Sequence, residues 1–239
     1  MSGHSKWSTI KHKKAKEDAK RGKIFTKLIR EITVAAREGG GDPIGNSRLR
    51  LAIEKAKAAN MPQDNIKRAI KKGTGELEGA TYEEAVYEGY GPFGVAVIVE
   101  TLSDNKKRTV SALRHLFSKM GGNLAETGAV SWMFEKKGVI KATASGLSED
   151  DILEKLIDYD VDDVSVSDGI VSVTCDIKQL DNVKKAIEAL GMKVEAAQIE
   201  WVPKNLITPS EKGAEEKVYK FLEAIEDLDD VQNVYTNLA

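Results

Sequence analysis

The sequence predicts an α+β protein, with an N-terminal three-helix bundle followed by two ferredoxin-like α/β domains, the third domain being inserted in the second. Three observations support this fold class. Apolar residues recur at helical spacing through residues 25–72, strand-like alternation begins after Gly73, and residues 138–202 follow the order strand, helix, strand, strand, helix, strand. The 239 residues are 41% hydrophobic and 31% charged, a composition typical of globular proteins. This length allows one large domain or two to three small ones.

Three amphipathic helices are predicted in the N-terminal part of the chain. The first carries its apolar face at Phe25, Leu28, Ile29, Ile32 and Ala36. The second is expected to begin at an Asn46 or Ser47 N-cap, and the third to begin with Pro62 and end at Gly73. Short helices joined by tight turns form a small bundle.

The middle of the chain has the pattern of a β-hairpin followed by a helix. Two alternating runs flank Gly91-Pro92-Phe93-Gly94, a helix is expected over about residues 106–120, and a strand is expected at residues 130–134. The segment from Gly89 to Gly94 matches the letters G-x-G-x-x-G, but a strand follows it. A dinucleotide site needs a helix at that point, so we interpret the segment as a turn.

The third part of the chain has the split βαβ order of a ferredoxin-like domain. Its first helix is expected to be capped by Ser148, and Asp168-Gly169 is a hairpin turn. The last helix and strand of the chain cannot form a stable unit alone, so we expect them to complete the middle domain. The predicted domains are therefore residues 1–75, residues 76–136 with 203–239, and the inserted residues 137–202.

Charge is distributed very unequally along the chain. Residues 1–72 hold 19 Lys/Arg and 7 Asp/Glu, a net charge of +12, whereas residues 73–239 hold 17 and 31, a net charge of −14. A basic end on an acidic protein indicates that this end meets a polyanion. The segment from His4 to Phe25 contains eight Lys/Arg and two acids, and it has too few apolar residues to be a core helix. We expect it to bind phosphates, with Trp7 and the neighbouring histidines stacking on bases.

The candidate nucleic-acid-binding residues come from this segment, the next helix and a second basic stretch, DNKKRT, at a predicted helix start that would bind anions. They are His4, Ser5, Lys6, Trp7, Lys11, His12, Lys13, Lys14, Lys16, Lys20, Arg21, Lys23, Lys27, Arg30, Asn105, Lys106, Lys107 and Arg108. Further cations extend the positive surface across the bundle, among them Arg37, Arg48, Arg50, Lys67, Arg68, Lys71 and Lys72.

Other function classes have little support in the sequence. The three histidines have no metal-ligand spacing, Cys175 is the single cysteine and is expected in the core, and no nucleophile elbow or Walker loop is present. We therefore predict a protein that is not an enzyme and that has no catalytic residues, metal or cofactor. No secretory signal and no apolar run of about 18 residues is found, which favours a cytoplasmic protein without a membrane partner. Nothing indicates an obligate dimer, so a monomer is expected.

Four motifs resemble the YebC/PmpR family. They are GHSKWSTIKHKKAKEDAKRGKIFTKLIREI, MPQDNIKRAIKKGTGE, YEGYGPFGVAVIVETLSDNKKRT and GGNLAETGAVSWMF, and the similarity runs from Ser2 through the C-terminal strand. The resemblance implies three domains, a helical bundle and two α/β domains around a cleft. It also implies two roles: many bacterial members are described as DNA-binding transcriptional regulators, while other relatives act in translation or at ribosomes stalled on proline-rich nascent chains. The chain departs from the family pattern at Phe93, Ala125 and Thr127.

Three functions remain open from the sequence. The favoured one is a translation factor that binds ribosomal RNA or tRNA, associates with the ribosome and relieves stalling, because a Lys/His/Trp segment suits irregular RNA. The second is a transcriptional regulator that binds duplex DNA. The lack of an evident recognition helix in the sequence argues against it. The third is an adaptor that binds proteins through its α/β domains.

Overall fold

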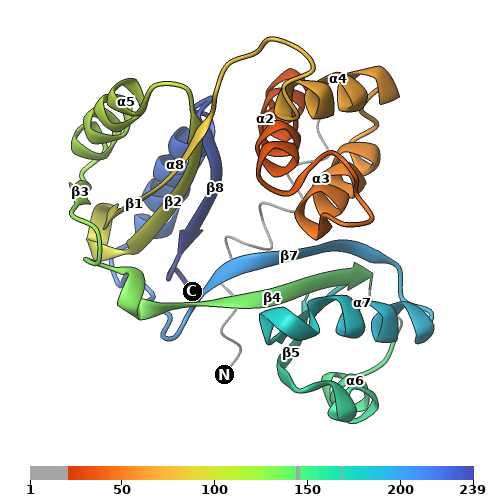
Figure 1. Ribbon diagram of the computed structural model, residues 1–239. Coiled ribbons are helices and arrows are strands. Elements are labelled where there is room, and N and C mark those ends of the chain that lie inside the picture. Colours follow the sequence, from red (N-terminus) through yellow and green to blue (C-terminus); the bar gives the residue numbers. More distant parts are fainter. Residues whose placement is uncertain (1–20, 144–145, 168) are drawn as a thin grey trace. The chain divides into compact units, whose positions relative to one another are not determined.

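The structure is a computed structural model that describes residues 21–143, 146–167 and 169–239. In these residues it contains seven α-helices and two four-stranded antiparallel sheets, which confirms the predicted α+β class (Figure 1). The described chain divides into two compact units. The first holds the residues as far as Ser131 together with Thr208–Thr236, and the second holds Trp132–Ile207 with Asn237–Ala239.

Three helices form the predicted bundle in the first unit: α2 (Arg21–Gly39), α3 (Ser47–Ala58) and α4 (Gln63–Gly73). Ile32, Leu49 and Ile66 are buried at their shared core. Asn46, one of the two residues predicted as the cap, is the N-cap of α3. Its Oδ1 accepts the Leu49 N–H at 3.0 Å, and its Nδ2 donates to the Ala35 carbonyl at 2.8 Å. One buried side chain thus fixes both the start of α3 and its position against α2.

The rest of the first unit is a sheet with two helices. In chain order its elements are β1 (Glu83–Tyr90), β2 (Ala96–Ser103), α5 (Lys106–Lys119), β3 (Asn123–Ala125), α8 (Ala214–Glu226) and β8 (Val231–Thr236). β1 and β2 pair as the predicted hairpin, and the strand order is β3-β1-β2-β8. Phe117 of α5 and Phe221 of α8 meet edge to face with ring centroids 4.9 Å apart. The C-terminal strand β8 pairs with β2, which lies more than a hundred residues earlier in the chain.

The second unit has the split βαβ arrangement. Its elements are β4 (Phe134–Thr143), α6 (Glu149–Lys155), β5 (Val161–Ser167), β6 (Ile170–Cys175), α7 (Leu180–Ala189) and β7 (Val194–Pro203). The order β5-β6-β4-β7 is that of a ferredoxin-like sheet. Ser148 caps α6 in a reciprocal capping box with Asp151, which confirms the predicted cap. The sheet of the first unit has a different order, with the β1–β2 hairpin in its centre. The reason is that its part of the chain begins with two consecutive strands, whereas the second unit begins with a strand and a helix.

The strand predicted at residues 130–134 is wrong. The short strand of this region is β3, directly after the glycines that end α5, while residues 127–130 form a turn and Ser131–Met133 a single 3-10 turn before β4. The cause is Glu88 in β1, which is 4% exposed. Its carboxylate accepts the N–H groups of Gly128 at 2.9 Å and of Val130 and Ser131 at 2.8 Å. These three N–H groups bind one carboxylate, so they cannot pair with a strand.

Replacing Glu88 with Gln should destabilise the fold by about 1–3 kcal/mol at neutral pH, because an amide cannot accept all three N–H groups. Burial alone would raise the pKa of Glu88, but its backbone hydrogen bonds outweigh burial and hold the pKa below its ordinary value. A lowered pKa gives stability that is present above about pH 4.3 and is lost as the pH falls further. The difference between wild type and Glu88→Gln in urea denaturation should therefore shrink below that pH.

The control for this measurement is Glu126→Gln, which changes an exposed carboxylate in the same loop and should alter stability by less than about 0.5 kcal/mol. Equal effects of the two substitutions at neutral pH would contradict the role given to Glu88.

Candidate nucleic-acid interface

Helix α4 has a basic face toward solvent. Its apolar side, with Ile66 and Ala69, is buried in the bundle, whereas its exposed side carries four cations: Lys67, Arg68, Lys71 and Lys72. None of these four makes an ion pair with any residue in the described ranges. The spacing of three and four residues places them side by side on the helix surface. They form a compact positive surface whose charges are available to an external anion, and we call it the α4 basic face.

Two lysines of α2 have partners inside the protein. Lys23 Nζ lies 3.2 Å from the Asp227 carbonyl and Lys27 Nζ lies 2.8 Å from the Glu226 carbonyl. Both carbonyls belong to the C-terminal end of α8, where a helix carries partial negative charge. Because these ammonium groups already stabilise a helix end, we expect them to contribute less to an external phosphate than the α4 basic face.

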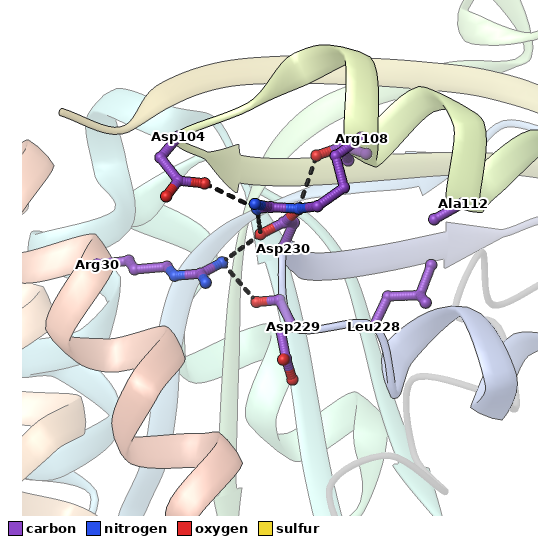
Figure 2. Close-up of a pocket in the computed structure, with 8 residues that line it drawn as sticks. Arg30, Asp104, Arg108, Ala112, Leu228, Asp229 and Asp230 are labelled. Atoms are coloured by element: carbon purple, nitrogen blue, oxygen red, sulfur yellow. Dashed lines mark hydrogen bonds and ion pairs between the residues drawn. The ribbon is translucent and has the colours of Figure 1, made fainter. Parts of the chain in front are cut away.

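Arg30 belongs to a cluster around Asp230 (Figure 2). Its Nη1 lies 2.8 Å from Asp230 Oδ1 and 2.7 Å from the Asp229 carbonyl, and Arg108 Nη2 lies 3.0 Å from both oxygens of Asp230. Thr109 donates to the same carboxylate at 2.7 Å. The side chain of Asp230 is only 10% exposed, and the arginines approach it from α2 and α5 on opposite sides, as Figure 2 shows.

The Asp230 cluster lines a pocket of about 350 Å³. Burial would raise the pKa of Asp230, but hydrogen bonds from Thr109, Arg108 and Arg30 outweigh it, so the pKa is lowered and the carboxylate is ionised at neutral pH. Asp104 and Asp229 also line the pocket. Three carboxylates against two guanidinium groups make a poor site for a phosphate, so the pocket is part of the fold and not of the interface.

The predicted anion site at the start of α5 is largely neutralised. Asn105 is the N-cap of α5 and accepts the Arg108 N–H at 3.0 Å. Lys106 pairs with Glu83 at 2.6 Å, and Arg108 pairs with Asp104 as well as Asp230. Lys107 is exposed and has no ion pair among the described residues. The helix start therefore offers one unpaired cation, not three.

The remaining candidate residues are not described by the structure. His4, Ser5, Lys6, Trp7, Lys11, His12, Lys13, Lys14, Lys16 and Lys20 lie outside the described residues, and α2 begins at Arg21. Of the described candidates, the structure brings Arg30 and Arg108 together, and it does so on an aspartate. No sequence pattern indicates that Asp230 holds both, although the acidic run EDLDD at residues 226–230 marks where the partners lie.

Within the described ranges, no group of three His, Cys, Asp or Glu side chains could hold a metal ion, and no helix is long and apolar enough to cross a membrane. Cys175 is completely buried. Burial, together with the nearby Asp162 and Asp176, raises the pKa of its thiol to about 11. A thiol of this kind is protonated at neutral pH and is a poor nucleophile.

Cys175 should therefore not react with dithiobisnitrobenzoate at pH 8 within minutes in the native protein, and should release one equivalent of chromophore after denaturation. Rapid release from the folded protein would show that the thiol is accessible.

Asp230→Asn should destabilise the protein by about 2–4 kcal/mol, because it leaves two arginines facing a neutral group, one of them in a largely buried position. The matched control is Asp229→Asn. The side chain of Asp229 is exposed, and Arg30 donates to its backbone carbonyl, which the substitution leaves in place. Chemical denaturation should show a change below about 0.5 kcal/mol for the control. Similar losses of stability in both variants would contradict the central role of the Asp230 carboxylate.

Comparison with known proteins gives consistent matches over the whole chain. Residues 5–76 match the model of the TACO1/YebC protein N-terminal domain, and residues 82–238 match the model of the TACO1/YebC second and third domain. A protein named probable transcriptional regulatory protein CT1665, from Chlorobaculum tepidum, is 54% identical over 239 residues, which is all of this chain and 95% of the relative. A probable transcriptional regulatory protein of Desulfosudis oleivorans is 53% identical over 237 residues, covering 99% of this chain and 96% of that protein.

A solved structure has the same fold. The crystal structure of a conserved hypothetical protein, Aq1575 from Aquifex aeolicus, matches with a TM-score of 0.85 and 50% identity, over 93% of this chain and 91% of that one. Together with the two domain models, this match agrees with the resemblance seen in the four sequence motifs. The chain belongs to the TACO1/YebC family, which is the YebC/PmpR family that those motifs resemble.

Proposed function

We propose that the protein is a nucleic-acid-binding regulator of gene expression that works without catalysis. The α4 basic face carries the proposal: four exposed cations stand together with no acidic partner in the described part of the chain. Such a surface releases counterions when phosphates replace them, which is the main source of affinity for nucleic acids. The basic segment that precedes α2 adds cations in the same net +12 part of the sequence.

The position of the cations on α4 favours phosphate contact over base reading. A recognition helix reads bases with residues near its N-terminus. In α4 the first turn holds Gln63 and Asp64, while the cations run from the middle of the helix to its C-terminal end. We therefore propose structured RNA as the ligand, ribosomal RNA or tRNA, and a role as a ribosome-associated translation factor that relieves stalling.

Duplex DNA is the second candidate, because relatives at 53–54% identity are named probable transcriptional regulatory proteins. Both ligands need the α4 basic face. A protein adaptor, the third function left open by the sequence, would not need it, so neutralising these cations separates the adaptor from the two nucleic-acid functions.

Reversing two charges on the α4 basic face, Lys67→Glu with Lys71→Glu, should weaken binding of bulk tRNA roughly tenfold or more. The magnitude of the slope of log K against log salt should also fall, by about 0.7–0.9 for each phosphate that the helix no longer neutralises. Fluorescence anisotropy at several salt concentrations measures both quantities. The control is Lys178→Glu with Lys212→Glu, which makes the same change in net charge at exposed positions outside the bundle. Equal weakening by both pairs would show that only net charge matters.

RNA and DNA are separated by crosslinking in cells, sequencing of the bound nucleic acid and sedimentation through a polysome gradient. We expect ribosomal or transfer RNA and co-sedimentation with ribosomes, and we expect both to disappear when Lys6, Lys11, Lys14 and Lys20 are changed to Glu. Discrete promoter fragments without ribosome association would establish the DNA alternative in its place.

A further inference from the structure

One tryptophan of the second unit is exposed. Trp132 is 65% exposed, and it is the only aromatic side chain among the large hydrophobic side chains exposed in the described ranges. Tryptophan is usually well buried, and where it is exposed it commonly marks a binding surface. A ring exposed to this extent adds little packing stability to the fold, so it calls for another explanation.

The backbone that carries Trp132 is fixed. Lys204 donates its N–H to the Met133 carbonyl at 2.9 Å and its ammonium to the Trp132 carbonyl at 3.0 Å. These bonds join the chain just before β4 to the chain just after β7, two strands that lie side by side (Figure 1). Because this backbone is already ordered, the protein loses little conformational entropy when a ligand covers the ring.

One cation accompanies this ring in a part of the chain that is otherwise acidic. The stretch from Trp132 to Ile207 holds nine lysines and fifteen acids, a net charge of −6. Beside Trp132, however, stands the exposed Lys204, whose ammonium binds the Trp132 carbonyl. Lys204 makes no ion pair with a described residue.

The other tryptophan of this unit is less exposed. Lys136 Nζ lies 4.8 Å from the centroid of the Trp201 ring, so one face of Trp201 is covered by a cation, and the residue is only partly exposed. Trp132, at 65%, is the more exposed of the two residues. An exposed indole beside an ammonium group suits a flat group attached to a phosphate better than an apolar protein patch.

We propose that Trp132 is a stacking platform for one unpaired base of a single-stranded RNA, with Lys204 beside it to meet the adjoining phosphate. The inference rests on the proposed function and deepens it, because it adds a base-contacting site to the phosphate-contacting α4 basic face. Stacking on an aromatic ring accepts any base, so the site holds unpaired RNA without reading its sequence.

The test uses the full chain and a ten-nucleotide oligouridylate. In a variant with Trp7→Phe and Trp201→Phe, Trp132 is the only tryptophan, and its fluorescence should be quenched as the RNA is added. Trp132→Ala should weaken binding of this RNA about tenfold, and Trp132→Phe should weaken it less, because a smaller ring retains part of the stacking. Trp201→Ala is the matched control and should leave the affinity within about twofold.

A double-mutant cycle assigns the contact to a base. Oligouridylates with a single abasic ribose should bind wild type more weakly at the position that stacks, and that substitution should have no further effect on Trp132→Ala. The α4 charge reversal should leave the effect of the abasic site unchanged. Circular dichroism of each variant establishes that it is folded.

The results distinguish the two proposals. If wild type binds tRNA with the salt dependence expected of the α4 basic face, but Trp132→Ala binds oligouridylate equally well and no quenching occurs, the stacking site is wrong and the proposed function stands. If Trp132→Ala keeps its RNA affinity but no longer associates with ribosomes in a gradient, the ring contacts a protein and the stacking site is again wrong. If wild type binds no nucleic acid, both proposals are wrong.

Discussion

The carboxylate of Asp230 is the interaction on which the first unit depends most. It joins Arg30 of α2, Arg108 and Thr109 of α5, and the start of β8, which are segments far apart in the sequence. A buried charge costs desolvation free energy that only several strong partners can offset. Asp230 has two guanidinium groups and two hydroxyls, because Ser103 also donates to it at 3.2 Å. Removing either arginine would leave part of the negative charge of this largely buried carboxylate without a partner.

Because of such internal pairs, fewer cations are available to a ligand than the net charge of the sequence indicates. A net charge of +12 over residues 1–72 counts every lysine and arginine as available to a ligand. In the structure, Lys23, Lys27 and Arg30 bind the end of α8 and the residues after it. The sequence could not reveal this, since about 200 positions separate the partners and no local pattern links them. The α4 basic face remains because its helix has no acidic neighbour of that kind among the residues that the structure describes.

Local signals in the sequence were sufficient for most of the fold. Asn46 and Ser148 cap helices where polar caps were expected, and the hairpin and the split βαβ order follow from periodicity. The error at residues 130–134 has a tertiary cause: these residues alternate like a strand, yet Glu88 binds the N–H groups at their start. Exposure, which singles out Trp132, depends on packing and cannot be read from residue type.

The two candidate surfaces differ in the physics of their binding, and this bears on how they could act together. The proposed contacts of the α4 basic face with phosphates would be ionic and would weaken with salt, whereas the proposed stacking on Trp132 would depend much less on salt. They lie in separate units. An RNA that reached both would bind with an affinity greater than either contact alone, since the second contact becomes intramolecular. Raising the salt concentration would then remove the ionic contribution first and leave the weak stacking contact. If both proposals hold, structured RNA offers phosphates for the first contact and an unpaired base for the second, whereas uninterrupted duplex DNA offers phosphates alone.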